Sequence, residues 1–105
     1  MTTVTNTLVN EENAPLPGIT ITIDLLDANF SPLSVAFTGI TQIAAKVIEH
    51  TNVNGKWSTD LFPNSEIIPV GTVYQVTQEV EGENLISKFV VPAGGPARHL
   101  SELII

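Results

Sequence analysis

Two histidines are the residues of this sequence best suited to acid–base or metal chemistry. His50 and His99 carry imidazole rings, which titrate near neutral pH and bind metal ions. Catalysis also requires a nucleophile and an orienting group that converge on the ring. No sequence feature indicates such a convergence at either position. We therefore predict that neither histidine is catalytic and that His50 is an outward-facing polar residue.

Three glutamates are spaced by two residues, at Glu79, Glu81 and Glu83. A pair of carboxylates could perform glycoside hydrolysis. Because a spacing of two places side chains on one face of a strand, the three carboxylates would line a strand end. Like charges in a row repel one another and normally stay in water. We predict a solvated edge, which also opposes edge-to-edge aggregation.

Metal and covalent chemistry have few candidates. Asn52, Asn54 and Asp60 could supply oxygens to calcium, but their spacing is not that of an EF-hand loop, and an Asn-Gly turn explains the asparagines more simply. Lys88 could form an isopeptide bond with an asparagine, although a surface lysine with a buried stem is far commoner.

The chain has no cysteine, which excludes disulfides, thiolate catalysis and cysteine-based zinc sites. Gly94-Gly95-Pro96 lacks the Lys-Ser/Thr of a P-loop. We predict no enzyme activity, metal or cofactor.

Composition narrows the function further. The chain has 105 residues, of which 43% are hydrophobic, so it forms one folded domain and is not disordered. Eleven acidic and four basic residues give a net charge of −7. The scattered basic residues argue against binding to nucleic acid or to an anionic membrane surface. No apolar run of about 20 residues and no signal peptide is present, so we expect synthesis in a cytoplasm and release by a route such as lysis.

Alternating apolar and polar residues predict strands. One strand is predicted at residues 19–25, where one face carries Ile19, Ile21, Ile23 and Leu25. Residues 72–80 form another strand, with residues 85–91 as its partner. Residues 1–14 are an N-terminal arm or a first strand, residues 34–42 have no clear assignment, and residues 47–53 favour a strand because they are rich in β-branched side chains. Asn54-Gly55 predicts a type I′ hairpin turn, with residues 56–61 as the return strand.

Turn signals between short strands therefore predict an all-β, antiparallel β-sandwich of about seven strands, with residues 15–105 forming a single domain. Trp57 is in phase with Thr59 and Leu61, which favours a buried tryptophan over an exposed one that stacks on a sugar. The predicted core consists of Ile19, Ile21, Ile23, Leu25, Trp57, Tyr74, Val76 and Phe89.

An ordered set of segments carries a family resemblance. The segments are Pro17–Thr22, Thr51–Ser58, Leu61–Asn64, Pro69–Val76, Phe89–Pro92, and Gly94–Pro96 followed by Leu100–Leu103. Together they resemble the immunoglobulin-like or transthyretin-like domains of bacteriophage minor tail, fibre and receptor-attachment proteins. This resemblance implies a virion structural protein that assembles with other virion proteins and supports host attachment. It also implies a homo-oligomer, with a trimer favoured.

Surplus apolar residues support an assembly role. Residues 85–91 carry apolar side chains on both faces, and the last six residues are mostly apolar, which is unusual for a terminus that does not dock. The predicted interface residues are Ile86, Val90, Leu100, Leu103, Ile104 and Ile105. For the C-terminal residues, docking on their own chain is the alternative to docking on a neighbouring subunit or virion partner. One alternative is a carbohydrate-binding or adhesin module, which would recognise a cell-surface glycan and expose Trp57 or Tyr74. Another is a capsid decoration protein.

Overall fold

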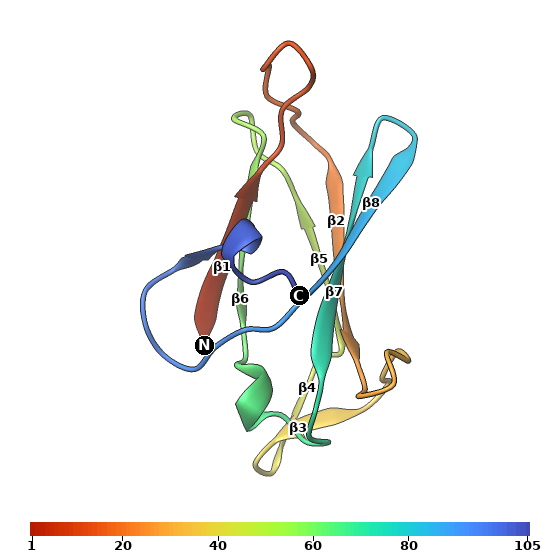
Figure 1. Ribbon diagram of the computed structural model, residues 1–105, viewed down its shortest axis with the longest axis vertical. Coiled ribbons are helices and arrows are strands. Elements are labelled where there is room, and N and C mark those ends of the chain that lie inside the picture. Colours follow the sequence, from red (N-terminus) through yellow and green to blue (C-terminus); the bar gives the residue numbers. More distant parts are fainter.

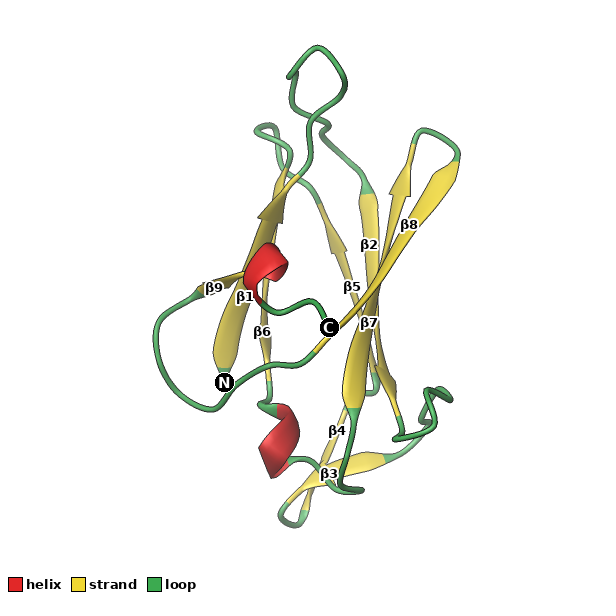
Figure 2. Cartoon of the chain, in the orientation of Figure 1, coloured by secondary structure: helices red, strands yellow, loops and turns green.

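Two stacked β-sheets carry the fold, and a small hairpin closes one end (Figures 1 and 2). The computed structural model describes residues 1–105. The strands are β1 (Thr2–Thr7), β2 (Thr20–Leu26), β3 (Ala36–Thr38), β4 (Thr41–Ile43), β5 (Lys46–His50), β6 (Lys56–Leu61), β7 (Val73–Val80), β8 (Glu83–Phe89) and β9 (Arg98–His99). Two short 3-10 helices complete the chain, η1 (Asn64–Glu66) and η2 (Leu100–Glu102).

The sheets have three and four strands, in the orders β6-β1-β9 and β5-β2-β7-β8. Their pairings are antiparallel, except that β9 runs parallel to β1. The predicted β-sandwich is therefore confirmed, with one parallel pair that the sequence did not indicate. None of the helices has the length and apolar character needed to cross a bilayer.

The inner faces of the two sheets form the core. On β2, the buried Ile21 and Ile23 alternate with the half-buried Thr20 and Thr22, as the period of two predicts. Ile19 is only half-buried and packs at the margin of the core. The other predicted core residues are all buried: Ile21, Ile23, Leu25, Trp57, Tyr74, Val76 and Phe89.

The N-terminal residues form a strand inside the sandwich. β1 lies in the middle of its sheet, where it pairs with β6 on one side and β9 on the other. Thr2 and Val4 are buried, because the inward-facing positions of β1 point at the other sheet. Residues 1–14 were expected to be an N-terminal arm or a first strand, and the structure has a strand there, at Thr2–Thr7.

The turn at Asn54-Gly55 differs from the predicted type I′ turn. Gly55 has a φ of 73°, but Asn54 has no positive φ. The N–H of Gly55 donates to the carbonyl of Asn52 at 2.9 Å, and the side chain of Asn52 accepts from the N–H groups of Asn54 and Lys56. This is a type I turn followed by a left-handed glycine. A type I′ turn matches the twist of two strands that pair as a tight hairpin. Since β5 and β6 lie in different sheets, a second positive φ is not required.

The strand after this turn pairs differently from the prediction. β6 was expected to return along residues 47–53, but it pairs with β1 from Thr2↔Leu61 to Thr7↔Lys56. β5 pairs with β2 in the opposite sheet. The turn therefore carries the chain from one sheet to the other. A local turn signal shows that the chain reverses, but the choice of partner depends on which distant strand completes a buried ladder.

The unassigned residues 34–42 form part of the closing hairpin. β3 and β4 pair with each other, with Ala36 buried and Ile43 packed at the margin of the core. The backbone of Phe37 exchanges two hydrogen bonds with Ile68, at 2.9 and 2.8 Å. This contact anchors the hairpin to the segment before β7, at the lower end of the view in Figure 1.

Candidate functional site

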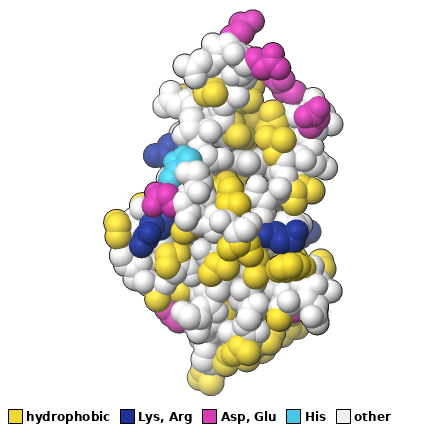
Figure 3. Space-filling view, in the orientation of Figure 1, with side chains coloured by type: hydrophobic (Ala, Val, Ile, Leu, Met, Phe, Trp, Pro, Cys, Tyr) yellow, Lys and Arg dark blue, Asp and Glu magenta, His cyan; other side chains and the backbone are white.

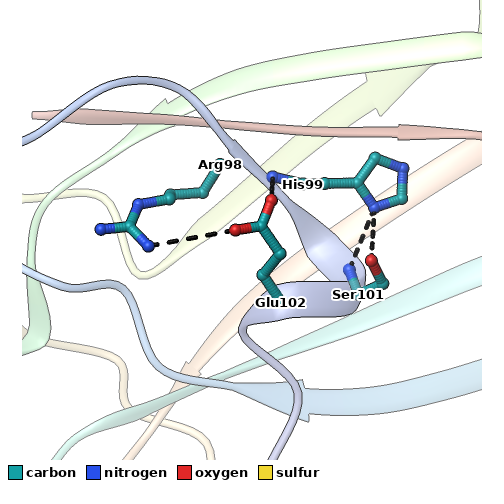
Figure 4. Close-up of polar contacts among 4 residues, drawn as sticks. All are labelled: Arg98, His99, Ser101 and Glu102. Carbon is teal, nitrogen blue, oxygen red and sulfur yellow. Dashed lines mark hydrogen bonds and ion pairs between the residues drawn. The ribbon is translucent and has the colours of Figure 1, made fainter.

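A polar cluster at β9 and η2 is the arrangement closest to catalytic geometry (Figure 4). His99 Nδ1 lies 2.8 Å from Ser101 Oγ, and Glu102 Oε1 accepts the backbone N–H of His99 at 3.2 Å. The carboxylate of Glu102 also lies 4.0 Å from Arg98 Nη1. The three residues His99, Ser101 and Glu102 are exposed at the surface.

This cluster is a helix cap. His99 Nδ1 accepts the backbone N–H of Ser101 at 3.2 Å, so the ring satisfies a donor at the start of η2. Glu102 binds the backbone of His99 and does not contact the imidazole, so no carboxylate orients the ring for catalysis. The proximity of Ser101 to His99 was missed in the sequence. The signal that could have revealed it is a glutamate three residues after an N-cap position.

The other residues with chemical potential are dispersed. His50 is exposed on β5, as predicted. Glu79, Glu81 and Glu83 are exposed, but Glu81 adopts a φ of 48° in the β7–β8 turn, so the three do not continue along one strand face. No group of three histidine or acidic side chains could hold a metal ion.

The residues considered for calcium are engaged in separate contacts. Asn52 uses its side-chain oxygen for the turn after β5, where it accepts two backbone N–H groups. Asp60 lies on β6 and accepts a hydrogen bond from the hydroxyl of Thr3. The structure therefore does not bring these oxygens together around one point.

Aromatic residues that could stack on a sugar are buried. Trp57 is 2% exposed, and its Nε1 donates to the side-chain oxygen of Gln78 at 2.9 Å. The Gln78 oxygen also accepts from Asn6 at 2.9 Å, so it bridges the two sheets. Tyr74 stacks on Phe89 with ring centroids 5.5 Å apart. The carbohydrate-binding alternative expected Trp57 or Tyr74 to be exposed, and neither is available as a platform.

A small apolar pocket lies between the start of β5 and the end of β6, which belong to opposite sheets. Its volume is about 140 Å³, and its lining includes Met1, Ile43, Val47 and Phe62. Tyr74 forms part of the wall and donates its hydroxyl to the carbonyl of Phe62 at 2.9 Å. Burial raises the pKa of the Tyr74 phenol above its ordinary value. The lining offers few polar groups to orient a substrate, so the pocket does not define a catalytic site.

Exposed apolar side chains gather at one end of the molecule, which we call the apolar end and define as Val35, Ile40, Ile68 and Val70. Ile40 is 99% exposed at the tip of the β3–β4 hairpin, and Val70 is 82% exposed in the turn before β7. Figure 3 shows hydrophobic side chains at this lower end. The opposite end carries Glu11, Glu12 and Glu81, which line one shallow hollow with Asn10.

A second exposed apolar region runs along β8 and the C-terminal residues. Phe30, Ile86, Ile104 and Ile105 line a shallow groove there, and the Lys88 ammonium lies 5.3 Å from the centre of the Phe30 ring. Of the predicted interface residues, four are exposed: Ile86, Val90, Ile104 and Ile105.

Leu100 and Leu103 were predicted to form an interface, and this prediction is wrong. Both are buried in the core cluster. η2 turns the chain back over the sandwich, and the carbonyl of Leu103 accepts the N–H of Val90 at 3.3 Å. The C-terminal segment therefore docks on its own chain. The leucines pack inward, while Ile104 and Ile105 stay at the surface.

The fold and these surfaces describe an all-β sandwich with exposed apolar regions. The sequence matches no protein-family model, and no curated protein is detectably similar to it.

Proposed function

We propose that this protein is a non-catalytic assembly module and that it serves as a structural protein of a bacteriophage virion. The observation that carries the assembly role is the apolar end. A protein with a net charge of −7 and a complete core has no folding requirement for Ile40 and Val70 to be apolar. Contiguous exposed apolar side chains mark sites of protein–protein contact.

The distribution of charge supports a fixed orientation in such an assembly. The molecule is elongated, with extents of 45 × 28 × 22 Å. Exposed apolar side chains lie at one end of the long axis, and glutamates gather at the other end (Figure 3). We infer that the apolar end docks on a neighbouring virion protein and that the acidic end faces solvent. The virion context rests on the resemblance of the sequence to domains of phage tail, fibre and attachment proteins.

A tail module and a capsid decoration protein would dock in the same way. Only the position in the virion therefore distinguishes these two alternatives. A supporting role in host attachment belongs to the tail alternative. The glycan-binding alternative has no exposed tryptophan or tyrosine to support it, so we do not propose it.

The test is co-expression of the chain with the products of its neighbouring genes. We expect a stable complex with a tail or capsid protein, and we expect the double variant Ile40→Asp, Val70→Asp to lose it. The matched control is Ile48→Asp, which places a carboxylate on another exposed isoleucine, on the outer face of β5. A complex that persists in the double variant would exclude docking through the apolar end. Neighbouring genes without virion products would exclude the virion class.

A further inference from the structure

The outer side of β8 is a sheet edge with unused backbone hydrogen-bonding groups. β8 is the last strand in the order β5-β2-β7-β8. The carbonyl of Lys88 accepts the N–H of Ile105 at 3.0 Å, so Lys88 directs its backbone groups away from β7. Since alternate residues of a strand point their backbone groups to the same side, Ile86 and Asn84 do likewise. No hydrogen bond outside the ladders engages the backbone of either residue.

The same edge already accepts a strand further along. Residues 103–105 run antiparallel to β8, with Ile104 opposite Phe89, and they cover the edge from Lys88 to Val90. The uncovered part runs from Glu83 to Ser87. In Figure 1 this upper part of β8 lies at the margin of the sheet, beyond the C-terminal segment. An added segment thus already pairs with one end of this edge, at Lys88 to Val90.

The centre of the uncovered stretch lacks the usual protection of an edge strand. Natural edges carry proline, charged side chains or a bulge that oppose pairing with another chain, and here the charged Glu83 stands only at the start of the stretch. Here the centre of the stretch is Leu85, which is 43% exposed, and Ile86, which is 55% exposed. The two side chains project from opposite faces of the strand. A second strand would therefore cover apolar surface on both faces.

Charge along β8 favours an antiparallel partner with the same sequence. The strand begins beside the carboxylates of Glu81 and Glu83 and ends near the ammonium of Lys88. Two antiparallel copies bring the acidic end of each strand towards the lysine of the other. Two parallel copies would instead place carboxylates against carboxylates, which is unfavourable between neighbouring strands.

We propose that β8 pairs antiparallel with β8 of a second copy of this chain, about a two-fold axis at Leu85. Leu85 is the midpoint of the uncovered stretch Glu83–Ser87, so this register pairs the whole stretch and leaves the Ile105 hydrogen bond intact. Asn84 lies opposite Ile86 of the second copy, and the two residues exchange N–H···O=C bonds. Two four-stranded sheets then become one continuous sheet. This surface is distinct from the apolar end and does not depend on the virion role.

Sedimentation equilibrium over a concentration series to about 500 μM, which covers weak complexes, tests the pairing. We expect a species with twice the monomer mass of 11.2 kDa. Leu85→Lys places two ammonium groups opposite each other, and we expect at least tenfold weaker association. Ile48→Lys is the matched control, because it introduces the same charge at an exposed position on the opposite edge strand of the sheet, and we expect unchanged association. Trp57 emission verifies that each variant is folded.

Cysteine cross-linking tests the register, because the chain has no cysteine of its own. In the proposed register Leu85 faces its counterpart in a non-hydrogen-bonded pair, where Cα atoms are about 4.5 Å apart and a disulfide can form. Leu85→Cys should give a disulfide-linked dimer on mild oxidation. Ile86→Cys should not, since its counterpart lies two residues away along the strand, about 8 Å distant and beyond disulfide reach.

A strictly monomeric protein would overturn the pairing, and so would a dimer that Leu85→Lys leaves unchanged. A trimer, which the family resemblance favours, would also overturn it. Cross-linking of Ile86→Cys without cross-linking of Leu85→Cys would reject the register at Leu85. None of these results affects docking through the apolar end, which the Ile40→Asp, Val70→Asp variant tests separately.

Discussion

The interior of the sandwich and the apolar end use the same kinds of side chain for different purposes. In the interior, Trp57 and Tyr74 are buried, and their polar atoms donate to Gln78 and Phe62. At the apolar end, Ile40 and Val70 are almost fully exposed. The apolar residues of the interior are explained by folding. Those of the apolar end are not, and the proposed docking on a partner would give a physical reason for their presence.

The comparison predicts that substitutions in the interior change stability, whereas substitutions at the apolar end change binding only. The largest effect is expected for Trp57→Ala. Removal of a buried tryptophan leaves a cavity and costs about 3–5 kcal/mol of unfolding free energy. Urea unfolding measures this loss. A loss below about 1 kcal/mol would show that the indole does not pack in the core.

Gly55→Val is expected to have the next largest effect. Gly55 has a φ of 73°, and a Cβ there would overlap the carbonyl oxygen of Leu8 and lie 2.9 Å from the N of Leu16. Both neighbours are backbone atoms, so we expect a loss of at least about 2 kcal/mol. Gly82→Val is the control, because Gly82 has a φ of 84° but open space around it. Equal losses of unfolding free energy in the two variants would mean that the close approach of Leu8 and Leu16 to Gly55 does not contribute to the loss.

Tyr74→Phe is expected to have a smaller effect, with a distinctive pH dependence. Loss of the hydrogen bond to Phe62 costs about 1 kcal/mol. Burial raises the pKa of Tyr74 in the folded state, while the unfolded phenol ionises near pH 10. The unfolded state therefore loses its proton first. The stabilisation from Tyr74 is complete below about pH 10 and decreases as the pH rises further.

The chain has one tyrosine, so its phenolate absorbance can be followed alone. We expect ionisation to coincide with unfolding in the wild type. We also expect the stability of Tyr74→Phe to fall less steeply above about pH 10. Ionisation near pH 10 in the folded protein would contradict the burial of this phenol.

Ile40→Ser is expected to have the smallest effect on stability. Ile40 is 99% exposed, so its replacement should change the unfolding free energy by no more than about 0.5 kcal/mol. Thermal or urea unfolding measures this. A loss above about 1 kcal/mol would show that the hairpin tip serves the fold, and the contrast between the two regions would then disappear.

The sequence predicts the interior well because burial in a strand leaves a local pattern. The alternation through Ile21, Ile23 and Leu25 locates an inward face without knowledge of the partner strand. The phase of Trp57 with Leu61 does the same for β6. These patterns depend only on neighbours along the chain.

Features that depend on distant contacts were not predicted. The pairing of β6 with β1, and the burial of Leu100 and Leu103, depend on which remote surface each segment meets. The buried Asn64 was also missed. Its side chain accepts the N–H of Val91 at 2.7 Å and donates to Thr72 at 3.1 Å. No local sequence pattern predicts these two hydrogen bonds. The apolar end was missed because residues 34–42 show no clear periodicity.

The hydrogen bonds of Gln78 have a consequence for the alignment of the two layers. Apolar contacts between sheets have no direction, so they tolerate a shift of one sheet along the other. Gln78 lies on β7, while its donors Asn6 and Trp57 lie on β1 and β6. A slip of one residue would move these donors by about 3.3 Å and leave a buried amide oxygen unsatisfied. The side chain of Gln78 thus selects one alignment among several that hydrophobic packing alone would permit.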